Sequence, residues 1–284
     1  MTNHFITARN NFAVGFAEKR ITLNGREWGL VKAGEVGPSL LLLPGTLGRA
    51  DIFWNQIDAL KERAQIYALS YPDSGSIELW VEDIIGFLDQ EGIQNVTLLG
   101  SSLGGYIAQY LTEKHPQRVK ALVAANTLNS AALVSNFPPY SLDLDKMPIE
   151  DLRKGFTDNM KQNVKANPES RELVELLLGE VEGRISDDEL RMRLKALKEG
   201  PELAEKFEGV CPVYTVESED DHLIPEPMRE LVRARLSPKK AFRFTVGSHF
   251  PYVVRPQEYV ALLEEVLGLN NTSNEWPDGT ISEQ

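Results

Sequence analysis

The stretch Val96-Thr-Leu-Leu-Gly100-Ser101-Ser102-Leu103-Gly104-Gly105 changes from one residue pattern to another at its centre. Its first half is an apolar run typical of a buried strand, and the residues after Ser102 repeat at helical spacing. A strand that turns abruptly into a helix needs small residues where the two elements approach, and Gly100 and Gly104 flank Ser102. The stretch therefore predicts a strained turn that lifts the Ser102 hydroxyl off the end of a sheet.

Similar β-rich runs recur along the chain and alternate with amphipathic helical patterns. Several are apolar throughout, such as Leu40–Leu43 and Ala121–Ala125, as is typical of parallel strands buried on both faces. The pattern predicts an α/β fold with about eight mostly parallel strands flanked by helices. The predicted strands span Lys19–Leu23, Glu27–Ala33, Ser39–Pro44, Gln65–Ser70, Val96–Gly100, Val119–Ala125, Pro212–Glu217 and Ala241–Val246.

Residues 130–208 break this alternation, because they contain helical patterns but no convincing strand. Such a segment is too long for a structureless loop, so we expect a helical cap inserted into the sheet domain. The sequence thus predicts a core in two parts, 1–129 and 209–269, separated by this cap. Residues 270–284 are polar and are predicted to form a loose tail.

The charge balance argues against some classes of partner. The 284 residues include 30 Lys and Arg against 42 Asp and Glu, a net charge of -12. A surface this acidic repels phosphate backbones and anionic lipid, so binding to nucleic acid or a membrane is disfavoured. The single cysteine, Cys211, excludes an internal disulfide, and no secretory signal is visible at the N-terminus. We therefore expect a cytoplasmic protein, and the sequence does not indicate its oligomeric state.

A serine hydroxyl is a poor nucleophile at neutral pH and needs a base within hydrogen-bond reach. His249 follows the last predicted core strand and precedes the last helix. Loops at the carboxyl ends of parallel strands meet at one edge of a sheet, so His249 is predicted to reach Ser102. The other three histidines have ordinary explanations as tail, helix-end and loop residues: His4, His115 and His222.

A third group should hold the imidazole by its second nitrogen. The loop after the strand at 212–217 offers three adjacent carboxylates, Glu219, Asp220 and Asp221. Either aspartate can face the site while the other is solvated. We favour Asp221, and Glu219 is the weaker alternative.

Acyl chemistry also needs two preorganised backbone N–H groups, an oxyanion hole. One is predicted at Leu103, directly after the candidate nucleophile. The other is predicted at Thr46, in the loop Pro44–Gly48, where the glycines let the backbone turn an amide inward. The alternative interpretation of Pro44–Gly48 is an ordinary Gly-rich loop that joins a strand to a helix and binds no oxyanion.

The expected substrate is a small to medium, largely uncharged acyl compound roofed by the cap. The sequence contains no zinc-binding motif, phosphate-binding loop or dinucleotide fingerprint, so no metal or cofactor is expected. Five apolar residues are candidates for the substrate pocket wall: Leu47, Phe137, Tyr140, Leu223 and Phe250.

The order of nucleophile, acid and base resembles the α/β-hydrolase superfamily over about residues 15–268. In that superfamily the acid commonly lies in a loop ending in proline, as Asp221 does before Pro225. The base commonly precedes an aromatic residue and a final helix, as His249 does. The superfamily's usual His-Gly before the oxyanion loop is Pro44-Gly45 here, which leaves open which amide is used.

Four stretches are further similar to the maspardin branch: Gly48–Ile57, Ala68–Pro72, Gly100–Gly105 and Phe250–Tyr252. That resemblance implies a binding or scaffold protein with uncertain catalysis, although this chain has a histidine at the base position. The leading hypothesis is a cofactor-free serine hydrolase acting on an ester, or else on a thioester or amide. The same triad could also serve a C–C bond hydrolase or a hydroxynitrile lyase.

Overall fold

Strand β5 (Val96–Ser101) lies at the centre of a single sheet in the computed structural model, which describes residues 2–269 and 280–283. Among these residues, nine strands pair in the order β1-β2-β4-β3-β5-β6-β7-β8-β9. The strands from β4 to β8 in this order run parallel, whereas β1, β2 and β9 pair antiparallel at the two edges. The predicted α/β class and mostly parallel sheet are confirmed.

All eight predicted strands form, and their ends agree with the prediction to within two residues. The ninth strand, β9, pairs with β8 in a region where the sequence predicts a loose tail. The free backbone groups at the β8 edge favour such a pairing, whatever the side chains are. Residues 270–279 of the predicted tail lie outside the described residues. The strands are β1 Lys19–Leu23, β2 Arg26–Ala33, β3 Ser39–Leu43, β4 Gln65–Ser70, β5, β6 Val119–Ala125, β7 Val213–Ser218, β8 Lys240–Phe244 and β9 Thr280–Glu283.

Helices cover both faces of the sheet. Strand β3 shows why its sequence is apolar throughout: Leu40 and Leu42 pack into one buried cluster, and Leu41 and Leu43 into the other. The first cluster includes residues of α2, α9 and α10, and the second includes residues of α3, α4 and α8. Within the described ranges, no helix has the length and apolar character needed to span a bilayer. The helices outside 130–208 are α1 His4–Gly15, α2 Trp54–Leu60, α3 Ile77–Gln90, α4 Leu103–Lys114, α8 Glu226–Leu236, α9 Pro251–Val254 and α10 Pro256–Leu267, with 3-10 turns at η1 Ala50–Phe53 and η2 Pro116–Arg118.

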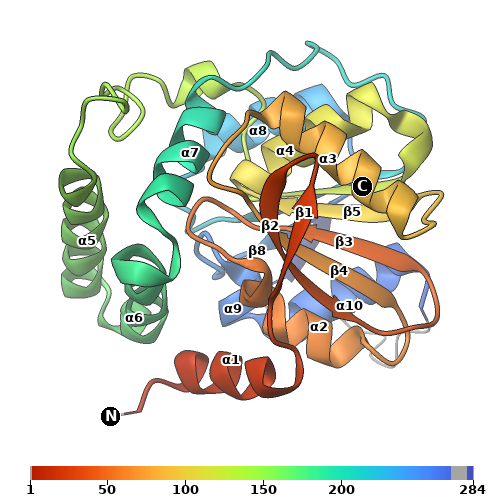
Figure 1. Cartoon of the computed structure of the whole chain (residues 1–284), viewed down its shortest axis with the longest axis horizontal. Helices are drawn as coiled ribbons and strands as arrows, with labels where there is room; N and C mark the ends of the chain where they lie inside the picture. Colours follow the sequence, from red (N-terminus) through yellow and green to blue (C-terminus); the bar gives the residue numbers. More distant parts are fainter. Residues whose placement is uncertain (1, 270–279, 284) are drawn as a thin grey trace.

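All residues of the segment 130–208 are described, and they form helices but no strand. Figure 1 shows α5, α6 and α7 together at the left of the view, with α5 farthest from the sheet. Helix α7 begins with a capping box, in which Ser186 and Glu189 satisfy each other's backbone N–H groups. Its helices are α5 Ile149–Ala166, α6 Arg171–Gly179 and α7 Asp187–Lys198, with 3-10 turns at η3 Ala131–Leu133 and η4 Pro168–Ser170 and a π-type turn, η5 Glu180–Arg184.

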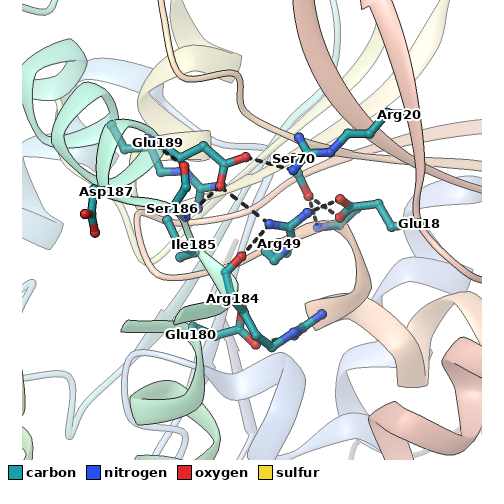
Figure 2. A network of polar contacts seen from close by, with 12 residues as sticks. Glu18, Arg20, Arg49, Ser70, Glu180, Arg184, Ile185, Ser186, Asp187 and Glu189 are labelled. Atoms are coloured by element: carbon teal, nitrogen blue, oxygen red, sulfur yellow. Dashed lines mark hydrogen bonds and ion pairs between the residues drawn. The ribbon is translucent and has the colours of Figure 1, made fainter. Parts of the chain in front are cut away.

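A partly buried polar network joins this helical segment to the sheet domain. Figure 2 shows Arg49, just before η1, between Glu18 on one side and Glu189 of α7 on the other. Arg49 also donates to the backbone carbonyl of Arg184, at 2.6 Å. In the same turn, η5, the buried carboxylate of Glu180 accepts from Arg9 of α1, at 2.7 Å. These contacts join the helical segment to the core through α1 and through the loop that precedes η1.

Candidate active site

Ser102 occupies the turn between β5 and α4, with a backbone φ of 54° and ψ of -117°. A serine in this region is strained by roughly 1–3 kcal/mol. The motif glycines make the turn possible, because a Cβ on Gly100 would collide with the Gly104 carbonyl, and one on Gly104 with the Leu43 carbonyl. The sequence thus correctly places Ser102 at a strained strand-to-helix turn.

Hydrogen bonds from the neighbouring strand hold this turn in place. The N–H of Ser102 donates to the Ala125 carbonyl at the end of β6, at 2.9 Å. The Thr127 hydroxyl donates to the Ser102 carbonyl at 2.7 Å. The turn is therefore fixed by contacts outside its own residues, as a strained conformation requires.

Asp221 and His249 form a buried pair. The Nδ1 of His249 lies 2.8 Å from Oδ2 of Asp221, and the two residues are 8% and 2% exposed. The other carboxylate oxygen of Asp221 accepts the N–H groups of Leu223 and Ile224, at 2.9 and 3.1 Å. Burial by itself raises the pKa of Asp221, but His249 and these hydrogen bonds outweigh it and hold the pKa below its usual range. An ionised Asp221 accepts only, so the Nδ1 of His249 carries the proton.

Asp220 has a different partner from its neighbour. Its Oδ1 accepts the backbone N–H groups of Gly247 and Ser248, at 2.9 and 2.8 Å. Ser248 has a positive φ of 49°, so Asp220 stabilises the sharp turn that presents His249. Glu219 is exposed. Of the three candidate carboxylates, the structure brings Asp221 to the imidazole.

Asn126, which the sequence analysis did not identify, connects the serine turn to the Asp221–His249 pair. It directly follows Ala125, the acceptor of the Ser102 N–H, and has a φ of 42°. Its buried side chain donates to Oδ2 of Asp221 at 3.0 Å and to the Ser248 carbonyl at 3.4 Å. The only sequence signal for this role was a polar residue directly after an apolar central strand.

The Ser102 hydroxyl and the His249 imidazole are not hydrogen-bonded to each other in the described part of the chain. The two residues lie on loops that share the Ala125–Asn126 corner, and Ser102 is partly exposed. Catalytic hydrogen bonds are often long before substrate binds and tighten only in the complex. The contact between these two side chains therefore stays a prediction.

The loop Pro44–Gly48 adjoins the serine turn. The N–H of Gly104 donates to the Pro44 carbonyl at 3.1 Å, and the N–H of Gly48 donates to the Gly45 carbonyl at 3.0 Å. The backbone N–H groups of Thr46, Leu47 and Leu103 have no acceptor among residues 2–269 and 280–283. Free amides on both sides of a serine are what an oxyanion hole requires.

A sequence model of the α/β-hydrolase fold family matches residues 38–256, which include every element of the site described above. The chain belongs to this family. In α/β-hydrolases the turn between this strand and this helix is called the nucleophile elbow, and Ser102 lies at that turn.

Sequence relatives of this α/β-hydrolase include enzymes and maspardin. A pimeloyl-[acyl-carrier protein] methyl ester esterase of Aeromonas hydrophila is 24% identical over 260 residues, which cover 82% of this chain and 96% of the esterase. Human maspardin is 25% identical over 238 residues, which cover 81% of this chain and 76% of maspardin. A hydrolase structure from Pseudomonas aeruginosa aligns with a TM-score of 0.72 at 18% identity, covering 89% of this chain and 98% of that one. At that identity the structural likeness shows the fold alone.

The predicted wall residues of the hydrolase lie in different environments. Leu47 is buried in the core, and Phe250 is partly buried against it. Burial raises the pKa of the Tyr140 hydroxyl to about 12, and an interaction with the Thr46 side chain opposes this rise. Phe137 and Leu223 are 61% and 57% exposed. The structure thus brings Tyr140 to the oxyanion loop, whereas contact of these side chains with a substrate stays a prediction.

Proposed function

We propose that this α/β-hydrolase is a serine hydrolase that cleaves a small to medium acyl ester through Ser102, His249 and Asp221. The observation that carries the proposal is the buried Asp221–His249 pair, joined through Asn126 to the corner that holds the Ser102 elbow. A buried imidazole hydrogen-bonded to a buried carboxylate, on a loop that shares the Ala125–Asn126 corner with a strained serine, has no evident structural purpose. The mechanism that follows needs no cofactor.

In the acylation step, the Nε2 of His249 takes the proton of Ser102 as the hydroxyl oxygen attacks the acyl carbon. The carbonyl oxygen becomes an oxyanion, which the free N–H groups of Thr46 and Leu103 stabilise. The imidazolium then protonates the leaving alkoxide, and the alcohol departs from the acyl-enzyme.

In the deacylation step, His249 takes a proton from water, and the hydroxide attacks the acyl carbon of the ester on Ser102. The same oxyanion hole stabilises the second tetrahedral intermediate. Collapse of that intermediate returns the proton to Ser102 and releases the acid. Throughout, the ionised Asp221 fixes the imidazole tautomer and stabilises its protonated form.

Two considerations guide the choice of substrate. The helical segment 130–208 is hydrogen-bonded to the oxyanion loop through Arg193, and we propose that it acts as a cap over the acyl chain. The name of the Aeromonas hydrophila relative describes a methyl ester esterase, which supports including methyl esters among the test compounds.

The second candidate function is a binding protein that retains the fold without catalysis. The similarity to maspardin and the absence of a Ser102–His249 hydrogen bond among the described residues favour it. Under this alternative, neither Ser102 nor His249 matters for activity, because no turnover exists.

Turnover of p-nitrophenyl and methyl esters of increasing chain length separates the two functions. The proposal predicts hydrolysis by the wild-type chain and a loss of about 10⁴-fold or more in Ser102→Ala. Ser101→Ala is the matched control, because Ser101 is the adjacent buried serine and has no part in the mechanism. Hydrolysis that survives in Ser102→Ala above a tenth of the wild-type rate would contradict the mechanism, and no hydrolysis of any ester favours the binding protein.

A further inference from the structure

Arg193 of helix α7 is fully buried and binds the oxyanion loop directly. Its Nη1 donates to the backbone carbonyls of Thr46 and Gly48, at 3.0 and 2.7 Å. These two carbonyls flank Leu47 in the loop that adjoins the Ser102 elbow and carries the free N–H groups of Thr46 and Leu47. A single guanidinium nitrogen therefore holds the loop on both sides of the free Leu47 N–H.

The position of Arg193 within its helix is unexpected for an arginine. It falls on the apolar stripe of α7, in register with the fully buried Leu190, Leu194 and Leu197. Its Nε and Nη2 are buried and have no hydrogen-bond partner in the described residues. Its Cζ lies 5.4 Å from the ring centre of Tyr71, whose hydroxyl donates to the Pro44 carbonyl at the start of the same loop.

A buried cation of this kind is costly for stability. Replacing a buried charge by an apolar side chain of similar volume is often neutral or stabilising. Burial lowers the pKa of Arg193 to about 10, so the guanidinium remains charged at neutral pH. Packing alone would favour a leucine or methionine at position 193. The presence of a charged side chain there therefore needs a reason other than packing.

The loop offers that explanation. The Thr46 carbonyl that accepts from Arg193 belongs to the same peptide group as the Leu47 N–H. Donation to the carbonyl polarises the peptide and strengthens the Leu47 N–H, a free donor directly after the proposed Thr46 donor. The C=O and N–H of a trans peptide point in opposite directions, so the Leu47 N–H points away from Arg193, and the positive charge favours an oxyanion bound to that N–H.

We propose that Arg193 is a positioning residue for the oxyanion hole, through which the helical segment 130–208 holds the loop 44–48 in its catalytic shape. This inference rests on the proposed function, since an oxyanion hole matters only if Ser102 forms an acyl-enzyme. It makes catalysis depend on the placement of helix α7.

The test compares Arg193→Met, which keeps the volume and removes the charge, with Arg193→Lys, which restores a cation. The matched control is Arg9→Met, because Arg9 is also a buried arginine that anchors this segment, through Glu180, but does not touch the loop. Each variant is characterised by ester kcat and KM, by melting temperature, and by inhibition with a trifluoromethyl ketone, whose adduct places an oxyanion in the hole.

Arg193→Met should lower kcat by about 10- to 100-fold with KM nearly unchanged, somewhat less than loss of a donor. Affinity for the trifluoromethyl ketone should fall in parallel, Arg193→Lys should recover part of both, and Arg9→Met should keep the wild-type kcat. An unchanged kcat in Arg193→Met, or an equal loss in Arg9→Met, overturns the inference while wild-type turnover still supports the proposed function. A wild-type chain without esterase activity overturns both.

Discussion

Asp220 and Asp221 are adjacent in the chain, yet each stabilises a different part of the His249 loop. Asp220 accepts the backbone N–H groups of Gly247 and Ser248, whereas Asp221 accepts from the imidazole of His249. Asp220 therefore shapes the loop, and Asp221 orients the His249 imidazole. Their unequal roles give the first test of the mechanism.

Asp221→Asn should lower kcat by about 10³- to 10⁴-fold, because an amide no longer fixes the imidazole tautomer or stabilises the imidazolium. Asp220→Asn keeps a carbonyl acceptor for both N–H groups and should cost much less, about tenfold. The kcat for ester hydrolysis, measured for both variants under the same conditions, tests whether the two aspartates have these different roles. Equal losses would show that Asp221 acts only through the shape of the loop.

The ionised Asp221 should also appear in the pH dependence of stability. Its pKa in the folded chain lies below the ordinary value of about 3.9, so the folded state binds the proton less tightly than the unfolded state. The stabilisation is complete above that ordinary value and is lost as the pH falls through the folded pKa. Urea unfolding at neutral and acidic pH should show that the free energy of unfolding falls less with decreasing pH in Asp221→Asn than in wild type.

The matched control for this pH experiment is Glu219→Gln, because Glu219 is an exposed neighbour in the same loop. It should follow the wild-type pH dependence. If acid lowered the free energy of unfolding as much in Asp221→Asn as in wild type, Asp221 would not be the carboxylate that the fold stabilises in its ionised form.

Asn126 should contribute to catalysis through its side chain and to folding through its backbone. Asn126→Gly keeps the positive φ but removes the hydrogen bond to Asp221, and kcat should fall by about tenfold with little loss of stability. Asn126→Ala loses the same bond and adds backbone strain, so it should also be less stable. A wild-type kcat in Asn126→Gly would show that the Asn126–Asp221 contact is dispensable.

The elbow glycines should be required for folding. Gly100→Ala places a Cβ against the Gly104 carbonyl and should destabilise the chain by at least about 1–3 kcal/mol. A Cβ in Gly86→Ala, in the middle of α3, meets only the side-chain nitrogen of Asn24 at 4.0 Å, an ordinary contact distance, so this variant should be neutral or stabilising by up to about 1 kcal/mol. Denaturant unfolding of the two variants provides the comparison, and equal stabilities would contradict the close approach of β5 and α4.

The sequence predicted the parts of the fold that repeat a strong local pattern. The apolar runs of the parallel strands and the elbow at Ser102 are examples, because burial on both faces and close packing restrict the residues allowed there. The sequence favoured Asp221 as the partner of His249 and left Asp220 and Glu219 as alternatives. Only the structure shows that Asp220 binds the turn at Ser248 while Asp221 meets His249.

Other features depend on contacts between distant segments and left little local signal. Asn126 contacts Asp221 across 95 residues of sequence, and Arg193 contacts Thr46 across 147. The pairing of β9 with β8 uses backbone groups, which every residue has, so the side-chain pattern does not predict it. The sequence does carry a local signal for Arg193, because an arginine stands among the leucines that repeat at helical spacing in α7.

Labelling with a fluorophosphonate probe tests the central claim most directly, because only an activated serine reacts with it. Peptide mass spectrometry should find one adduct, on Ser102, in the native wild-type chain, and none after heat denaturation or in His249→Ala. Native wild-type protein without an adduct on Ser102, or equal labelling in His249→Ala, would contradict the proposal that His249 activates this serine.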